Sequence, residues 1–214
     1  MCESCKNLGS IYCDECCRNI NLADFYEATD SNDEAQKESL KKKAISEWMS
    51  LETSAKFQEA FNKAAAFTLS EEDPGYSFRY ALAGVHVSQS SLSASDGAIF
   101  ADIYHFNPTE LVGKTIVEIN EDKVAVCNDP FPDTRLAFRN TGKNLIKLPE
   151  PIIEEDIVHF DLETPVAIKK SYYDKIINCL SGDIFLYYNP EKLAPLLFSG
   201  SNGRIVVAPL RKKY

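Results

Sequence analysis

The residues best suited to chemistry in this sequence are five cysteines within its first seventeen positions. They form two Cys-x-x-Cys pairs separated by seven residues, and a fifth cysteine directly follows the second pair. Each pair can present two thiolates to one metal ion, and two pairs complete the tetrahedral four-cysteine set of closed zinc sites. We therefore predict a zinc-binding knuckle over residues 1–18, with ligands Cys2, Cys5, Cys13 and Cys16, and with Cys17 as the alternative to Cys16.

Two other interpretations of the cysteine cluster stay open, an iron–sulfur cluster and a set of free or disulfide-bonded thiols. Reducing compartments disfavour disulfides, which favours metal binding. Nothing in the segment supplies an open coordination position or a nearby general base, so we expect a structural ion, not a catalytic one. The two remaining cysteines, Cys127 and Cys179, fall in strand and helix patterns and are expected to be small core residues.

Composition and charge narrow the class of protein. The chain has 214 residues, a net charge of -9 and a pI of about 4.9, which disfavours a protein that simply coats nucleic acid. A local basic face is still compatible with this balance. The N-terminus lacks a secretory signal and the apolar runs are too short to cross a bilayer, so we expect a cytoplasmic protein without a membrane partner.

The elements that must position any site lie mostly after residue 43. Residues 19–43 are polar and predict a linker or a solvated helix, whereas residues 44–214 have the composition of one packed α+β domain. Helical spacing predicts helices over Ile45–Phe67 and Ile168–Leu180. Predicted strands are Phe78–Val87, Ser91–Ala94, Ala98–Phe106, Thr115–Ile119, Lys123–Cys127, Leu136–Phe138, Ile157–Leu162, Ile184–Tyr188, Leu196–Phe198 and Ile205–Ala208.

Three segments resemble the bacterial DNA polymerase sliding clamp, the ring that tethers polymerase to DNA. They are Arg79–Val85 (RYALAGV), Leu92–Gly97 (LSASDG) and the C-terminal Leu193–Phe198 and Ile205–Arg211. Their order, with a helix before each set of strands, carries the resemblance. It implies one clamp-like domain of two helix-plus-sheet halves over about residues 44–211, preceded here by the zinc knuckle.

The sequence also departs from the clamp pattern. A bacterial clamp chain carries three such domains, and this chain has room for one. The His-Arg-Leu that usually follows Asp-Gly is replaced by Ala98-Ile-Phe100, and the cysteine segment has no counterpart in the family. One domain per chain would need self-assembly or a partner to encircle a duplex.

The resemblance implies two kinds of site. Because clamp helices face DNA, the resemblance implies that five lysines on or beside the two predicted helices face DNA: Lys56, Lys63, Lys169, Lys170 and Lys175. The same lysines could instead form an ordinary solvated helix surface. Contacts of this kind are electrostatic and independent of DNA sequence. The apolar groove that clamps offer to partner peptides implies Leu196, Phe198, Val207, Pro209 and Leu210.

No motif of a phosphate-binding loop, a dinucleotide fold, a nucleophile elbow or a zinc protease occurs in the sequence, so no enzyme is indicated. The leading interpretation is a non-enzymatic tethering or processivity factor in DNA replication, which oligomerises around double-stranded DNA and binds replication or transcription proteins. The alternative is a monomeric accessory or decoy protein, of viral origin for example, that docks on that machinery through its zinc segment.

Overall fold

The computed structural model describes residues 44–51, 53–69, 80–120, 122–139, 141–163, 165–190 and 194–210. The five cysteines of the predicted zinc knuckle and the predicted linker lie outside these ranges, as do Arg79, Leu193 and Arg211 of the clamp-like motifs. The zinc knuckle therefore stays a prediction.

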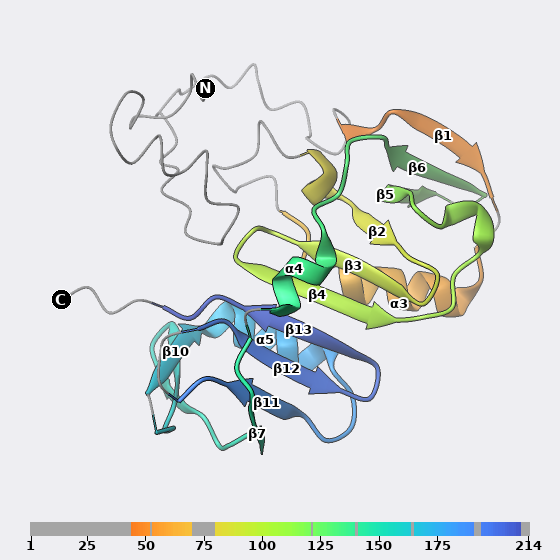
Figure 1. Ribbon diagram of the computed structural model, residues 1–214. Coiled ribbons are helices and arrows are strands. Elements are labelled where there is room, and N and C mark those ends of the chain that lie inside the picture. The colour runs from red at the N-terminus through yellow and green to blue at the C-terminus, as the bar shows by residue number, and fades with distance from the viewer. Residues whose placement is uncertain are drawn as a thin grey trace, which may run out of the picture.

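One large antiparallel sheet dominates the described residues (Figure 1). Its order is β1-β6-β5-β2-β3-β4-β13-β12-β11-β7. The strands are β1 (Glu47–Ser50), β2 (Val85–Val87), β3 (Ser91–Ser95), β4 (Ile99–Tyr104), β5 (Thr115–Asn120), β6 (Lys123–Cys127), β7 (Asn144–Lys147), β11 (Phe185–Tyr188), β12 (Leu196–Gly200) and β13 (Gly203–Val207).

The sheet consists of two halves with the same plan. In the first half the helix α3 (Ala55–Ala65) precedes β2, β3 and β4, and in the second half α5 (Lys170–Cys179) precedes β11, β12 and β13. The two halves meet where β4 of the first pairs antiparallel with β13 of the second, from Ile99↔Val207 to Ile103↔Gly203. The predicted repeat of a helix-plus-sheet unit is confirmed.

Both helices cover the same face of the sheet and lie behind it in Figure 1. Alternation along the strands sends one set of side chains toward them. On β4, for example, Ile99, Ala101 and Ile103 are buried in a cluster that also holds Phe57 of α3 and Phe198 of β12. A single hydrophobic core therefore spans both halves.

A small second sheet packs beside α5. It contains β8 (Ile152–Glu154), β9 (Ile157–Phe160) and β10 (Val166–Lys169) in the order β10-β9-β8. The Phe160 ring lies 5.9 Å from that of Phe198 and 6.1 Å from that of Tyr173. These rings join the small sheet to the second half of the large one.

The opposite face of the large sheet, here called the outer face, is covered by connecting segments. The short helices η3 (Tyr80–Ala83) and α4 (Thr134–Arg139) lie on this side, and η4 (Thr109–Leu111) leads into β5. The ring of Phe100 on β4 meets the rings of Phe131 and Phe138 edge-on, at 6.3 and 5.4 Å. These contacts hold the segment between the halves against the outer face.

Several predicted element boundaries are wrong. The predicted helix Ile45–Phe67 begins only at Ala55, since Ser54 caps it by accepting a hydrogen bond from the Phe57 backbone N–H at 3.2 Å. The residues before it form β1, which pairs with β6 from Glu47↔Val126 to Ser50↔Lys123. Trp48 and Met49 thus follow a strand period, not a helix period.

Three further differences concern the connections. Residues 136–138 form part of α4 instead of a strand, and residues 80–83 form η3 ahead of a shorter β2. Ile168 belongs to β10, so the second helix starts two residues later than predicted. The strands β1, β7, β8 and β10 were not predicted, and β1 and the end of β10 fall in segments for which a helix was predicted.

Candidate functional site

The predicted DNA-facing residues of α3 lie at the border of its exposed side. Phe57, Phe61 and Ala64 point into the core, and Lys56 and Lys63 flank the exposed side. The Lys63 ammonium lies 2.8 Å from Glu59 Oε1, one helical turn earlier. This hydrogen bond, with the charge of Lys63, lowers the pKa of Glu59, so the pair is ionised and locally neutral.

The lysines of the second helix are arranged in the same way. Lys170 donates to Asp174 Oδ2 at 2.5 Å, one turn along α5. Lys169, directly before the helix, lies 5.7 Å from the centroid of the Tyr172 ring. Lys175 is half-buried and forms no ion pair within the part of the chain that the structure describes.

The carboxyl-terminal ends of the two helices meet. The Cys179 thiol at the end of α5 lies 3.9 Å from the backbone carbonyl of Lys63, in the last turn of α3. Helix carboxyl ends carry partial negative charge, so the Lys63 ammonium offsets an unfavourable convergence. Together the two helices carry four lysines and two carboxylates, which makes this face weakly basic on an acidic chain.

The predicted partner-groove residues divide into two groups. Leu196, Phe198 and Val207 are fully buried in the core, so they offer no surface to a peptide in this structure. Pro209 and Leu210 are half-buried, and the Leu210 backbone N–H donates to the Ala167 carbonyl of β10 at 2.7 Å. Alternation on β12 and β13 explains the burial, because these three side chains point to the helix-covered face. Peptide binding at Pro209 and Leu210 stays a prediction.

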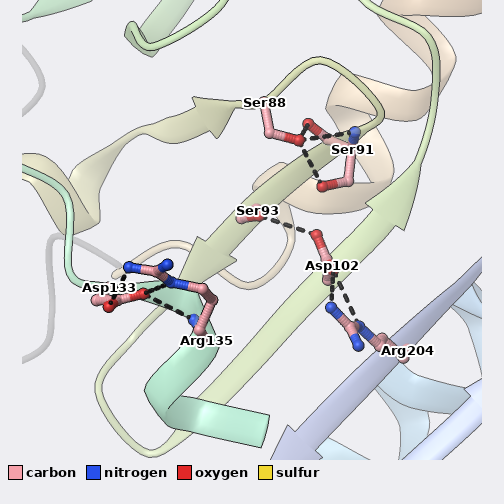
Figure 2. A network of polar contacts seen from close by, with 7 residues as sticks. All are labelled: Ser88, Ser91, Ser93, Asp102, Asp133, Arg135 and Arg204. Carbon is pink, nitrogen blue, oxygen red and sulfur yellow. Dashed lines mark hydrogen bonds and ion pairs between the residues drawn. The ribbon is translucent and has the colours of Figure 1, made fainter.

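A polar network that the sequence interpretation missed lies on the outer face, at the junction of the halves (Figure 2). Asp102 of β4 is 5% exposed, and its Oδ1 accepts from the Ser93 hydroxyl at 3.0 Å. Its Oδ2 accepts from Arg204 Nε at 3.0 Å and Nη2 at 2.9 Å. The Arg204 guanidinium also stacks 3.8 Å from the centroid of the Phe138 ring. The network therefore joins β3, β4, β13 and α4.

The network borders a shallow hollow of about 350 Å³. Serine hydroxyls line it, and that of Ser88, in the turn before β3, lies 2.8 Å from that of Ser91, the first residue of β3. His86 lines the hollow as well, and burial lowers its pKa, so the ring is neutral near pH 7. Its ring stacks on Phe131 at 5.1 Å. A signal for the network was present in the sequence, since Asp102 interrupts the apolar segment Ile99–Ile103.

No group of three metal-ligating side chains occurs among the described residues. In those same ranges, no helix is long and apolar enough to span a membrane. The two described cysteines, Cys127 and Cys179, are buried as predicted.

Comparison with known proteins shows which fold this architecture resembles. No protein-family model and no curated protein matches the sequence. Among solved structures, the chain is similar to the pol III beta protein of Caulobacter crescentus, with 14% identity, a TM-score of 0.55 and coverage of 78% of this chain and 67% of that one. It is also similar to the beta clamp of Helicobacter pylori in complex with 3,4-difluorobenzamide, with 13% identity, a TM-score of 0.52 and coverage of 76% and 66%.

The chain has the sliding-clamp fold. The predicted resemblance to bacterial clamps is thus confirmed at the level of structure, at identities too low to carry function. A third clamp, from Bartonella birtlesii and bound to griselimycin, gives 16% identity, a TM-score of 0.50 and coverage of 88% and 70%. The chain spans about two thirds of the length of the clamps that it matches.

Proposed function

We propose that this protein is a non-enzymatic, clamp-like tether in DNA replication, acting in the cytoplasm on double-stranded DNA. The observation that carries the proposal is the clamp fold itself, in which α3 and α5 cover one face of a sheet that is continuous through both halves. Their lysines give that face a basic character on a chain of net charge -9. An acidic exterior with a basic inner face can hold DNA without reading its sequence.

Assembly into a ring follows from the two ends of the large sheet. β1 and β7 are its terminal strands, and each has one neighbour only in the described sheet. Antiparallel pairing of β1 with β7 of another copy, with the helix-covered faces on the same side, would set Trp48 opposite Leu145 on the outer face and Glu47 opposite Ile146 on the helix face. Trp48 and Leu145 are half-exposed, and burial of apolar side chains against each other favours such edge-to-edge pairing.

Light scattering at increasing protein concentration tests the assembly. Trp48→Glu and Leu145→Lys should each reduce the oligomer, and the double variant should restore it, because an opposite-charge pair then replaces the apolar pair. A strict monomer at high concentration, or a double variant no better than the single ones, contradicts assembly through these strands. A monomer would favour the accessory or decoy alternative.

Salt-dependent DNA binding tests the basic face. Lys56→Ala and Lys175→Ala should weaken binding equally for all sequences, and each should reduce the slope of log affinity against log salt by about one. Lys123→Ala is the matched control, since Val124 beside it points to the core and Lys123 therefore points to the outer face. Equal effects of the control and the helix variants would exclude the helix face as the DNA surface.

The zinc knuckle is proposed as a separate structural element that docks the clamp-like domain onto replication or transcription proteins. Its thiolates form a closed set of four, with Cys16 and Cys17 still alternatives for the fourth position. Elemental analysis of the full chain should find one zinc per chain, lost in Cys2→Ser/Cys5→Ser. The absence of zinc, or bound iron with visible absorbance, contradicts the zinc assignment.

A further inference from the structure

The two edge strands of the small sheet differ in whether another segment of the chain covers them. The free edge of β10 receives a hydrogen bond from the Leu210 backbone N–H to the Ala167 carbonyl at 2.7 Å, so the C-terminal segment covers it. The other edge strand, β8, pairs only with β9 among the described strands, and all three of its residues are exposed. Uncovered edges are templates for pairing with another chain.

β8 also exposes apolar side chains on both of its faces. Ile153 lies on the side of Val158, which faces the core, but Ile153 is itself 50% exposed. Ile152 lies on the opposite side, across from His159, and is 52% exposed. Ile157 of β9 is exposed on that same side. An added strand could thus cover apolar surface above and below the sheet.

The register shows which backbone groups are available. Residues 155 and 156 form the turn of the β8–β9 hairpin, with Glu154↔Ile157 as the closing pair. Hydrogen-bonded and non-hydrogen-bonded pairs alternate along an antiparallel ladder, and the closing pair of a two-residue hairpin is hydrogen-bonded. The N–H and C=O of Ile153 are therefore directed to the free edge.

The charge around β8 determines what can bind there. Residues 148–163 contain six carboxylates and no lysine or arginine. Two of them, Glu150 and Glu154, belong to the strand or lie just before it, and Glu155 and Asp156 form the turn. A second copy of β8 would bring like charges together, which disfavours self-pairing.

We infer that β8 is a docking strand for an extended segment of a partner protein in which β-branched apolar residues alternate with lysine or arginine. The partner adds a fourth strand to the small sheet through the backbone of Ile153. Its apolar side chains cover Ile153 on one face, and its cations lie against Glu150 and Glu154 on the other face, with their aliphatic stems over Ile152. Main-chain bonds give such strand addition its affinity, and side chains give it specificity. The inference stands apart from the clamp role, because it needs neither DNA nor assembly.

Fluorescence anisotropy with the full chain and a labelled Lys-Val-Lys-Val-Lys-Val peptide tests the inference. Binding should saturate, weaken with salt, and be absent for Glu-Val-Glu-Val-Glu-Val. Ile153→Pro removes the N–H at the free edge but no ladder bond to β9, so it should weaken peptide binding about tenfold or more. Val112→Thr, an exposed position away from the small sheet, is the matched control and should bind as the wild type does.

A second variant distinguishes loss of peptide binding from loss of folding. Ile152→Thr/Ile153→Thr keeps strand propensity and removes the apolar contact, and its thermal unfolding should match that of the wild type while peptide binding falls. Equal binding by a stably folded Ile153→Pro variant overturns the inference. So does binding of the acidic peptide, or a dimer that forms without peptide and disappears in Ile153→Pro.

Discussion

The two halves of the molecule share one plan but differ in how completely the chain covers them. In the first half, the outer face is sealed by Ala44, Ala83 and Tyr80, which pack on Val117 and Cys127. In the second half, Leu145 and Phe185 remain half-exposed on the outer face. Trp48 and Tyr104 of the first half are also half-exposed on this face, so the covered part is the region over β5 and β6, and the second half has no such cover over β7 and β11 among the described residues.

The largest expected effect tests whether the halves are one folding unit. Phe57 and Phe198 lie in different halves but in the same buried cluster. Phe198→Ala should lower the free energy of unfolding by about 3–5 kcal/mol, as cavities left by buried aromatic residues do, and Phe57→Ala should cost a similar amount.

Two probes can separate the outcomes. Trp48, the only tryptophan, lies on β1 of the first half, so its fluorescence reports that half, whereas far-UV circular dichroism reports the whole chain. In Phe198→Ala both transitions should shift together. A Trp48 transition that stays in place while the circular dichroism shifts would show that the halves unfold separately.

The junction between the halves should give the second-largest effect. Asp102→Ala leaves the Arg204 guanidinium without its carboxylate, and loss of one partner of a buried ion pair is costly. Because the Arg204 side chain is 40% exposed, water replaces part of the lost interaction, and we expect a loss of about 2 kcal/mol in urea unfolding.

A matched control lies next to this junction. Asp133 and Arg135 form a pair of similar length, with Arg135 Nε at 3.0 Å from Asp133 Oδ1, but the pair lies in solvent beside α4 (Figure 2). Arg135→Ala should leave the unfolding midpoint unchanged, because it removes the ion pair and keeps the hydrogen bond from the backbone N–H of residue 135 to Asp133. Equal effects of the two variants would show that Asp102 does not hold the halves together.

The sequence predicted secondary structure correctly where the spacing of apolar residues matches the burial pattern of the element. The strands β3, β5 and β6 were predicted to within a residue at each end, and the two-half plan followed from the order of helices and strands. The prediction failed at residues 47–50, because their apolar spacing continues that of α3 and only pairing with β6 makes them a strand.

Site prediction failed for a related reason. A resemblance of motifs assigned Leu196, Phe198 and Val207 to a surface, but strand alternation turns all three into the core. The Asp102–Arg204 pair joins residues 102 positions apart in the sequence, and only the β4–β13 register brings them together.

The buried thiols of the two halves allow a further comparison between the halves, with a smaller expected effect. Burial raises the pKa of Cys127 in the first half, and it raises that of Cys179 at the meeting of α3 and α5 to about 11. From an ordinary value of 9.0, this reduces the thiolate fraction of Cys179 at pH 8 roughly a hundredfold.

Iodoacetamide labelling followed by peptide mass spectrometry should therefore find both thiols protected in the folded chain and reactive in urea. Cys179 should be the slower of the two. Faster labelling of Cys179 would show that the ends of α3 and α5 separate in solution, and that the halves are joined less tightly than the sheet implies.

The smallest expected effect is a pH dependence in the first half. Burial lowers the pKa of His86 below its usual 6.5, so the unfolded chain takes up a proton at a higher pH than the folded one does. The stability that neutral His86 contributes is complete above pH 6.5 and is lost as the pH falls through the folded pKa. His86→Phe keeps an aromatic ring against Phe131 and should flatten the dependence of the unfolding free energy between about pH 7.5 and 5. If the variant retains the wild-type slope of unfolding free energy against pH, another group causes the pH dependence. His86 would then be reached by water in the folded chain, and the outer face of the first half would be less well covered than its packing implies.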